Sequence, residues 1–347
     1  MKRALFRKKV KGRIHCTLCP RNCFVPEGKV GYCGVRKTIK GVLYSLVYGR
    51  PASVAIDPVE KKPFFHFAPA SRALSIATVG CNFSCKYCQN WDISQFHKFN
   101  ELNEETVKQF NEVHPKSLIE LAKERNIEGM AWTYTEPTVF FEYFYDTARL
   151  DKKHKFYQVW VSNGYTNVDA IKKAAKYLDA VNIDYKGDEE FYRKVVGGAK
   201  LEYVHEALAT YKKLGVWIEV TNLLIPGYND SPKVIKEMVK WIADNLGPET
   251  PLHFSAYYPA YEMSAPPTSL ETLEKAIKIA DEYLDYVYIG NVHHERESTY
   301  CPHCKKLLIR RVGFTVENVG LERKKNKFYC KHCGHEIPIK GEKWAKI

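Results

Sequence analysis

Eleven cysteines fall into three groups, and the size of each group bears on its chemistry. The middle group has three thiols, Cys81, Cys85 and Cys88, in the stretch GCNFSCKYCQN. The outer groups have four thiols each, which are Cys16, Cys19, Cys23 and Cys33 near the start and Cys301, Cys304, Cys330 and Cys333 near the end. Four protein ligands close a structural metal site, whereas three leave one coordination position open. The pattern therefore predicts that the middle group is the reactive centre.

The three-cysteine loop directly follows an apolar run, residues 73–80, that is typical of a buried strand. We expect the three thiols to lie on a tight loop at the carboxyl end of this strand, which is the face of an α/β barrel where active sites are built. Three thiolates on a cluster of four irons leave the fourth iron free, so a substrate can bind there.

The elements that must position this loop are indicated by alternation along the chain. Between Ser71 and Asn291, short apolar runs alternate with longer helical patterns, which predicts parallel strands joined by crossover helices. The expected strands are residues 73–80, 128–136, 156–164, 180–186, 216–226 and 251–259, with a seventh short run at 286–291. The predicted fold class is α/β, an incomplete (β/α)6 barrel of the TIM type.

Helix signals support the same interpretation. Periodicity predicts helices over 167–178, where Asn167 is expected to cap the first turn, and over 268–284. A further helix is expected to begin at Ser231, with Pro232 at the first helical position. We predict three parts: a basic four-cysteine module over 1–70, the barrel over 71–294, and a second small module over 295–347.

The charge of the chain is unevenly distributed. The formal net charge is +13, with about +12 in residues 1–70, −6 in 71–294 and +7 in 295–347. A basic flank can attract nucleic acid or an acidic protein, and it can equally be a solvated lysine-rich surface. The amino-terminal residues contain no apolar signal region, and no long apolar run follows. We therefore expect a cytoplasmic protein without a membrane contact, where cysteines bind metals rather than form disulfides.

The CxxxCxxC loop, with Tyr87 directly before its third cysteine, resembles the radical S-adenosylmethionine (SAM) superfamily. Further stretches in matching order make the chain similar to the AmmeMemoRadiSam system radical SAM enzymes, which are relatives of the pyruvate-formate-lyase-activating enzymes. These stretches are CTLCPRNC, GYCGVR, TYTEPTVF, VWVSNGYT, NIDYKG, LLIPGYND and GNVHHERESTYCPHC. The resemblance covers nearly the whole chain, and the cysteine loop is its most specific motif.

This resemblance implies a [4Fe–4S] cluster on the loop, with the methionyl amino and carboxylate groups of SAM on its unique iron. Such a cluster cleaves SAM reductively to methionine and a 5′-deoxyadenosyl radical, which abstracts hydrogen from a substrate. The resemblance also implies a flavodoxin- or ferredoxin-like electron donor, and Memo-like and AMMECR1-like partner proteins. The substrate stays open: a protein glycine, as in the activases, an RNA or a small molecule.

Contacts to SAM are implied at the ends of three predicted strands and beside the third cysteine. The residues concerned are Tyr87, Glu136, Ser162, Asn163, Gly164, Asp184 and Lys186. A carboxylate at 136 suits the methionyl ammonium, although a Glu before a turn can also be a surface residue. Asn-Gly at 163–164 is also a plain turn dipeptide. The Asp-x-Lys pair at 184–186 lies on one side of a strand, and its alternative role is an isolated salt bridge.

The chain departs from its relatives at two positions. Val161 replaces an aspartate that helps to bind a monovalent cation in the pyruvate-formate-lyase-activating enzymes, so we do not expect that ion. Tyr258 stands where relatives commonly have histidine, and a phenol with an ordinary pKa of about 10 must act differently. We interpret His253, earlier in the same run, as a core histidine rather than a catalytic one.

The spacing of cysteines predicts one metal for the C-terminal group and leaves two alternatives for the N-terminal group. The knuckles CPHC and CKHC at 301–304 and 330–333 flank a β-rich spacer, which is typical of a zinc ribbon. The spacing Cys-x2-Cys-x3-Cys-x9-Cys at 16–33 fits either zinc or a second iron–sulfur cluster. The neighbouring histidines are expected to be bystanders, because the cysteines already complete both sites.

A rival hypothesis from another class is a non-catalytic zinc metalloprotein with three metal sites that binds nucleic acid or protein partners. It differs from the enzyme in its metals, since it contains zinc alone.

Overall fold

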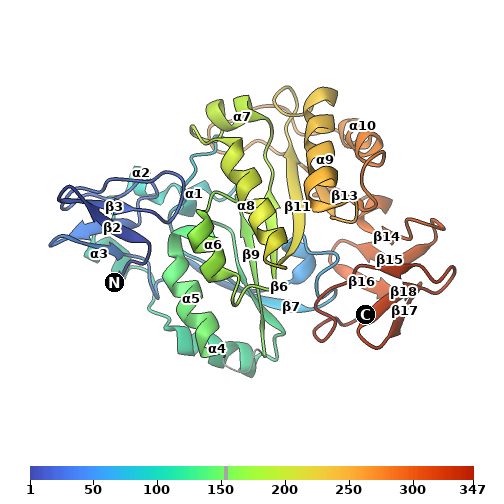
Figure 1. Ribbon diagram of the computed structural model, residues 1–347, viewed down its shortest axis with the longest axis horizontal. Coiled ribbons are helices and arrows are strands. Elements are labelled where there is room, and N and C mark those ends of the chain that lie inside the picture. The colour runs from blue at the N-terminus through green and yellow to red at the C-terminus, as the bar shows by residue number, and fades with distance from the viewer. Residues whose placement is uncertain (152–154) are drawn as a thin grey trace.

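One large sheet organises the molecule (Figure 1). The computed structural model describes residues 1–151 and 155–347. Seven strands, β7 to β13, run parallel and lie in space in the order in which they occur in the chain, and β6 pairs antiparallel with β7. In chain order these strands are β6 (Ser53–Pro58), β7 (Arg72–Ala77), β8 (Gly129–Trp132), β9 (Tyr157–Ser162), β10 (Ala180–Asp184), β11 (Trp217–Leu224), β12 (Leu252–Ala256) and β13 (Val287–Gly290).

The parallel α/β architecture predicted from the sequence is confirmed. All seven expected apolar runs contain a strand, including the short seventh run, although each strand is shorter than the run that predicted it. The strands are apolar because helices and loops cover them: β8 is buried along its whole length, and β12 likewise. The sheet is open, with β6 and β13 as its two edges.

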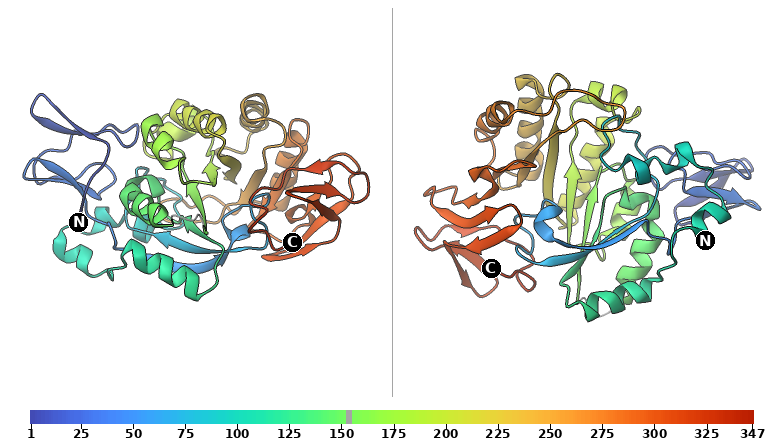
Figure 2. Two further views of the ribbon diagram at one scale, coloured as in Figure 1. Left: turned by 60° about the horizontal axis from the view of Figure 1, so that its bottom comes forward. Right: turned by 180° about the vertical axis from the view of Figure 1, so that it is seen from behind.

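Helices connect the parallel strands and lie along one face of the sheet in Figure 1, whereas the strands are seen directly from behind in Figure 2. The helices are α1 (Trp91–Ser94), α2 (Phe96–Phe99), α3 (Glu104–Lys108), α4 (Pro115–Glu124), α5 (Phe141–Leu150), α6 (Val168–Ala174), α7 (Glu189–Lys194), α8 (Leu201–Lys213), α9 (Pro232–Leu246) and α10 (Leu270–Ala280). Short 3-10 turns are η1 (Val59–Lys61), η2 (Pro137–Phe140) and η3 (Glu295–Glu297).

Local sequence explains where these helices begin and end. The Ser231 side chain accepts a hydrogen bond from the Val234 amide at 3.3 Å, as the sequence predicted, and Gly247 ends α9 with a φ of +97°. The prediction for Asn167 was wrong in its detail. Asn167 occupies the N-cap position of α6, but its side-chain amide donates to the Thr17 carbonyl at 2.9 Å. A long-range contact to the N-terminal module has displaced the local cap.

The N-terminal module consists of two small sheets. Strands β1 (Lys2–Arg3), β5 (Val42–Ser45) and β4 (Arg36–Ile39) form one, and β2 (Arg7–Val10) and β3 (Arg13–Cys16) form the other. A buried ion pair attaches it to α5: both terminal nitrogens of Arg36 donate to Glu142, at 2.8 and 2.9 Å, and each side chain is about 2% exposed.

The C-terminal module contains two three-stranded sheets. Their strands are β14 (Thr299–Tyr300), β15 (Leu307–Val312), β16 (Thr315–Asn318), β17 (Leu321–Lys324), β18 (Lys327–Cys330) and β19 (Glu336–Ile337). The module packs beside β13 and the segment after η1: Arg311 donates to the Phe65 carbonyl at 2.8 Å, and the Lys340 amide donates to the His66 carbonyl at 2.8 Å. The two modules lie at opposite ends of the molecule (Figure 2).

A search of the described ranges finds no helix with the length and apolar character that crossing a membrane requires.

Candidate active site

A cavity of about 350 Å³ lies at the carboxyl ends of the parallel strands. Its size lies within the range of small-molecule pockets. Nine of the residues singled out in the sequence line it: Cys81, Cys85, Tyr87, Cys88, Glu136, Ser162, Asn163, Asp184 and Lys186. These residues are spread over about a hundred positions of the chain, and the parallel sheet brings them together because consecutive strand ends meet at one edge.

The cysteine loop is fixed by the backbone on both sides. Gly80, directly before Cys81, has a φ of +95°, and a Cβ there would lie 2.5 Å from a Val35 methyl group. The amides of Ser84 and Lys86 donate to the carbonyls of Val196 and Val195 at 3.2 and 3.0 Å. The loop is therefore held between the N-terminal module and the chain that follows α7.

Of the three thiols, Cys85 is buried, whereas Cys81 and Cys88 are half-buried. Burial is the main reason that the pKa of each is raised, to about 12 for Cys85. The Cys88 Sγ lies 3.1 Å from the Ser94 hydroxyl, and the Asn163 amide lies 3.8 Å from the Cys81 Sγ. Since thiols bind metal as thiolates, a cation must replace these protons when the site fills.

Glu136 is the buried carboxylate of the cavity, with an exposed fraction of 1%. Its Oε1 accepts from the Thr138 amide and hydroxyl, at 3.0 and 2.6 Å, and from the Ser162 hydroxyl at 2.9 Å. Its Oε2 accepts from the Asn163 backbone amide at 2.9 Å, the one donor to this oxygen among the described residues, so it can accept one more donor. Burial is the main cause that raises the pKa of Glu136, against these hydrogen bonds. The sequence's alternative of a surface glutamate does not fit a buried carboxylate.

Asp184 and Lys186 also line the cavity and form an ion pair, with Lys186 Nζ 2.9 Å from Asp184 Oδ2. Burial is the largest single effect and lowers the pKa of Lys186, but the attractions of Asp184, Tyr87 and Cys85 together raise this pKa well above its ordinary value. The ammonium also lies 5.7 Å from the centre of the Tyr87 ring. The Asp184 side chain is 37% exposed, whereas that of Lys186 is 11% exposed.

Gly164 has a different position from its two neighbours. It ends β9 with a φ of +72°, and a Cβ there would approach Ile183 and Val204 at 3.0 and 3.2 Å. Gly164 therefore forms a tight turn next to the cavity-lining residues but does not line the cavity itself. A plain turn was the alternative role that the Asn-Gly dipeptide left open.

Residues 75–242 match the Radical SAM superfamily. The chain is also 45% identical over 343 residues to an uncharacterized protein of Methanocaldococcus jannaschii, in an alignment that covers 98% of this chain and 99% of that protein. The chain belongs to the radical SAM superfamily. SuiB of Streptococcus suis bound to precursor peptide SuiA has the same fold, with a TM-score of 0.50 at 13% identity over 68% of this chain and 52% of that chain. A domain of a pyruvate-formate lyase-activating enzyme from Bacteroides vulgatus is 19% identical, with a TM-score of 0.40, and the alignment covers 47% of this chain and 99% of that chain.

Radical SAM enzymes use a [4Fe–4S] cluster and SAM, and the chain's own donor set fits both groups. Three thiols line a cavity that also contains a buried carboxylate with accepting capacity and an ion-paired lysine. These groups suit the methionyl part of SAM. The Glu136 carboxylate can accept hydrogen bonds from its ammonium, and the Lys186 cation can pair with its carboxylate.

Sequence reasoning missed one part of this radical SAM cavity. The cavity is also lined by Lys61, the last residue of η1, by Lys62, which follows it, and by Tyr134. Lys62 is 2% exposed, donates to Asp57 at 2.8 Å and lies 4.0 Å from the centre of the Tyr134 ring. Burial is the main cause that lowers its pKa to about 8. The one sequence signal was the pair of lysines in DPVEKKPFF, which was interpreted as a domain boundary.

His253 and Tyr258 do not line the cavity, whereas Val161 does. His253 is buried and lies 2.8 Å from Glu219, which confirms a core histidine. Tyr258 is 47% exposed, and its hydroxyl donates to the Asn291 carbonyl at 3.2 Å. Val161 lines the cavity with an apolar side chain, where no oxygen is available to a cation.

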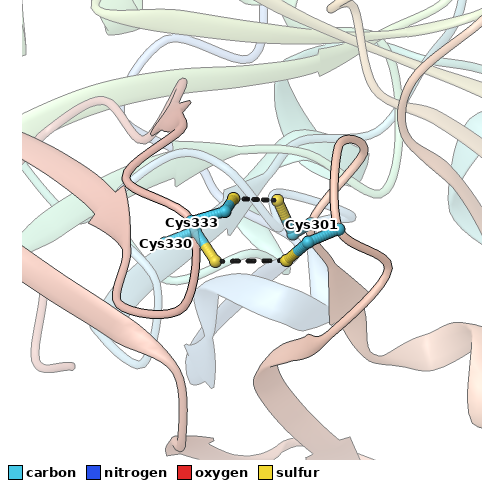
Figure 3. A group of neighbouring side chains, drawn as sticks. Cys301, Cys330 and Cys333 are labelled. Carbon is cyan, nitrogen blue, oxygen red and sulfur yellow. Dashed lines mark hydrogen bonds between the residues drawn. The ribbon is translucent and has the colours of Figure 1, made fainter.

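The C-terminal cysteines form a compact metal-ligand set (Figure 3). The Sγ atoms of Cys301 and Cys333 are 3.7 Å apart, those of Cys304 and Cys330 are 3.6 Å apart, and all four lie within 4.8 Å of one another. A tetrahedral ion with metal–sulfur bonds of about 2.3 Å requires sulfurs about 3.8 Å apart. One metal ion therefore fits among them.

Proposed function

We propose that this protein is a radical SAM enzyme whose catalytic cluster is held by Cys81, Cys85 and Cys88. A [4Fe–4S] cluster bound there supplies the electron that cleaves SAM to methionine and a 5′-deoxyadenosyl radical, which abstracts hydrogen from a substrate. The observation that carries the proposal is the convergence of three thiols, the buried Glu136 and the Asp184–Lys186 pair on one cavity in a chain of this superfamily.

Each residue has a role that follows from its contacts. The free capacity of Glu136 Oε2 suits the methionyl ammonium of SAM, and Ser162 and the Asn163 amide hold this carboxylate in position. Lys186, kept charged by Asp184, suits the methionyl carboxylate, and the buried Tyr87 ring closes the wall beside it. Gly164 shapes the turn that aims Ser162 and Asn163 into the cavity.

For the C-terminal set we propose Zn²⁺, because four thiols at the spacing of one tetrahedral ion are the usual donor set of a structural zinc site. This module then has the form of a zinc ribbon. Its apolar cluster is small, and a metal would supply much of its stability.

The order of the motifs favours the AmmeMemoRadiSam group and, with it, Memo-like and AMMECR1-like partners in the cytoplasm. A protein glycine is then one candidate substrate, and a small molecule or an RNA is another. Incubation with candidate partners without oxygen, followed by electron paramagnetic resonance (EPR), separates these: a persistent glycyl radical supports the activase, and turnover without such a radical supports the others.

The enzyme itself is tested by anaerobic reconstitution with iron, sulfide, dithionite and SAM, with 5′-deoxyadenosine as the measured product. Replacing any of Cys81, Cys85 and Cys88 by alanine should abolish the product, since the cluster loses a ligand. Lys86→Ala is the matched control, because it truncates an exposed side chain of the same loop that is not a cysteine, and it should preserve product formation. Zinc alone in the reconstituted protein, with tight RNA binding and no product, would instead favour the non-catalytic metalloprotein.

A further inference from the structure

The three cysteine groups differ in how far apart their sulfurs lie. Within residues 1–151 and 155–347, the C-terminal group is the one set of three or more cysteine, histidine or acidic ligand atoms that all lie within 4.8 Å of one another. Cys81, Cys85 and Cys88, for which the superfamily implies a cluster, are therefore spaced more widely than one ion requires. A cluster of several irons separates its thiolates more than a single ion does, because each thiolate binds a different iron.

The N-terminal four cysteines share the wider spacing and nevertheless face one another across a common space. Cys16, Cys19, Cys23 and Cys33 all line a second small cavity, separate from the catalytic one. Leu18 and Val139 supply its apolar wall, and Cys16 and Cys33 are buried. Among the described residues these four thiols do not form a set within 4.8 Å, as a single zinc ion would require, and this wider arrangement favours a cluster.

A buried cation with an unused donor also lines this second cavity. Arg36 is 2% exposed, and its terminal nitrogens bind Glu142. Its Nε–H is buried and has no hydrogen-bond partner in the part of the chain that the structure describes. A buried N–H without a partner is costly, and cluster sulfurs accept such donors. Arg21, at the same cavity, adds a second positive charge opposite the negative charge of a four-thiolate cluster.

The second cavity adjoins the catalytic loop. Asn82 lines the N-terminal cavity, whereas Cys81 and Phe83, on either side of it, line the catalytic one. A Cβ on Gly80 would lie 2.7 Å from the Cys33 carbonyl oxygen, so the two cysteine loops touch through their backbones. Arg21 Nε donates to the Asn82 carbonyl at 3.0 Å, and Asn163 bridges the Asn82 side chain, at 2.8 Å, and the Cys81 sulfur.

We propose that Cys16, Cys19, Cys23 and Cys33 hold a second [4Fe–4S] cluster that relays electrons to the catalytic cluster. A cluster held by these four cysteines would accept one electron from a reduced donor protein of the ferredoxin or flavodoxin class. It would give that electron to a cluster held by Cys81, Cys85 and Cys88 and so regain its oxidised state. The relay rests on the proposed function, since it needs a catalytic cluster as its acceptor, but the metal at the N-terminal cysteines does not.

The metal is tested first, in full-length protein with Cys81, Cys85 and Cys88 all replaced by alanine. This variant leaves the N-terminal module as it is. After anaerobic reconstitution it should contain about four iron and four sulfide per chain, half of the wild-type amount, and the EPR signal of its reduced form should not respond to SAM. Zinc at this site, or a wild-type content of about four iron, overturns the inference.

The relay is tested in the Cys19→Ala/Cys23→Ala variant by comparing two reductants. The rate of 5′-deoxyadenosine formation with reduced flavodoxin, divided by the rate with dithionite, should fall by about tenfold or more relative to wild type. An unchanged ratio contradicts the relay even if the second cluster is present. The catalytic cluster of this variant should keep an EPR signal that shifts when SAM is added, which verifies that the barrel is folded.

The outcomes for the two proposals are distinguishable. A wild-type protein that has two clusters but forms no 5′-deoxyadenosine with any reductant refutes the proposed function and leaves the N-terminal cluster standing. Formation of 5′-deoxyadenosine by a protein with a single cluster refutes the N-terminal cluster and supports the proposed function.

Discussion

The two four-cysteine modules use the same number of thiols and differ in almost everything else. The C-terminal sulfurs lie at the spacing of one tetrahedral ion, in a module at the opposite end of the molecule from the N-terminal module. The N-terminal thiols are more widely spaced and line a cavity, and the carbonyl of Cys33 lies against Gly80, directly before the catalytic cysteine loop. The number of cysteine ligands therefore does not determine the function of a metal site. The distances between the sulfurs and the residues around the site are more informative.

The largest expected effect concerns the metal of the C-terminal module. Cys301→Ser should abolish zinc binding and unfold residues 295–347, because structural zinc contributes on the order of 10 kcal/mol to small domains that fold around it. Zinc content, thermal unfolding and limited proteolysis of this module measure the loss. His303→Ala is the control: its exposed ring lies beside the knuckle but outside the ligand set, so the zinc should stay. A Cys301→Ser protein with full zinc content would contradict a structural site.

The second effect concerns how the N-terminal module is attached. Glu142→Leu should destabilise the protein by about 3–5 kcal/mol in urea unfolding, because it leaves the Arg36 guanidinium buried without its carboxylate. The double variant Arg36→Met/Glu142→Leu removes both charges and should recover much of that stability. If the double variant is no more stable than Glu142→Leu, the ion pair does not determine the attachment, and apolar packing does.

The sequence predicted the parallel sheet, because strand periodicity is a local signal, and the resemblance to the radical SAM superfamily indicated nine of the cavity-lining residues. It could not assign the N-terminal metal, since the spacing of cysteines along the chain says nothing of the distance between their sulfurs. It also missed Lys62 and Tyr134, whose approach depends on η1 folding back over the sheet edge. Asn167 shows the same limit, because a distant carbonyl replaced its predicted local cap.

The third effect is a dependence on pH where the C-terminal module meets the sheet. His66 is fully buried, with one ring nitrogen 3.2 Å from the Pro338 carbonyl and the other 2.6 Å from the Tyr288 hydroxyl. Burial is the main cause that lowers its pKa to about 4; Glu219 opposes this shift, and Arg311 and His253 add to it. The folded pKa lies below the unfolded value of about 6.5, so the unfolded chain binds more protons between these two values.

Stability should therefore be fully present above about pH 6.5 and fall by up to about 3 kcal/mol as the pH falls to about 4. Urea unfolding across this range measures the slope. His66→Gln keeps a donor and an acceptor without a titrating ring, so its slope should be smaller over the same range. Equal slopes for the two proteins would show that other groups cause the acid sensitivity.

The smallest expected effect concerns the contact between the N-terminal module and the catalytic loop. Gly80→Ala introduces a Cβ that meets Val35 and the Cys33 carbonyl at a φ of +95°, whereas Gly12→Ala, at a φ of +76°, meets nothing within 4 Å. Both variants bear the strain of a left-handed backbone, about 1 kcal/mol, but only Gly80→Ala must also move the two cysteine loops apart. Its additional loss should be about 1–3 kcal/mol in urea unfolding. If the loops exchange electrons, Gly80→Ala should also slow flavodoxin-supported formation of 5′-deoxyadenosine more than Gly12→Ala does, because separation of the loops weakens the electronic contact between the clusters.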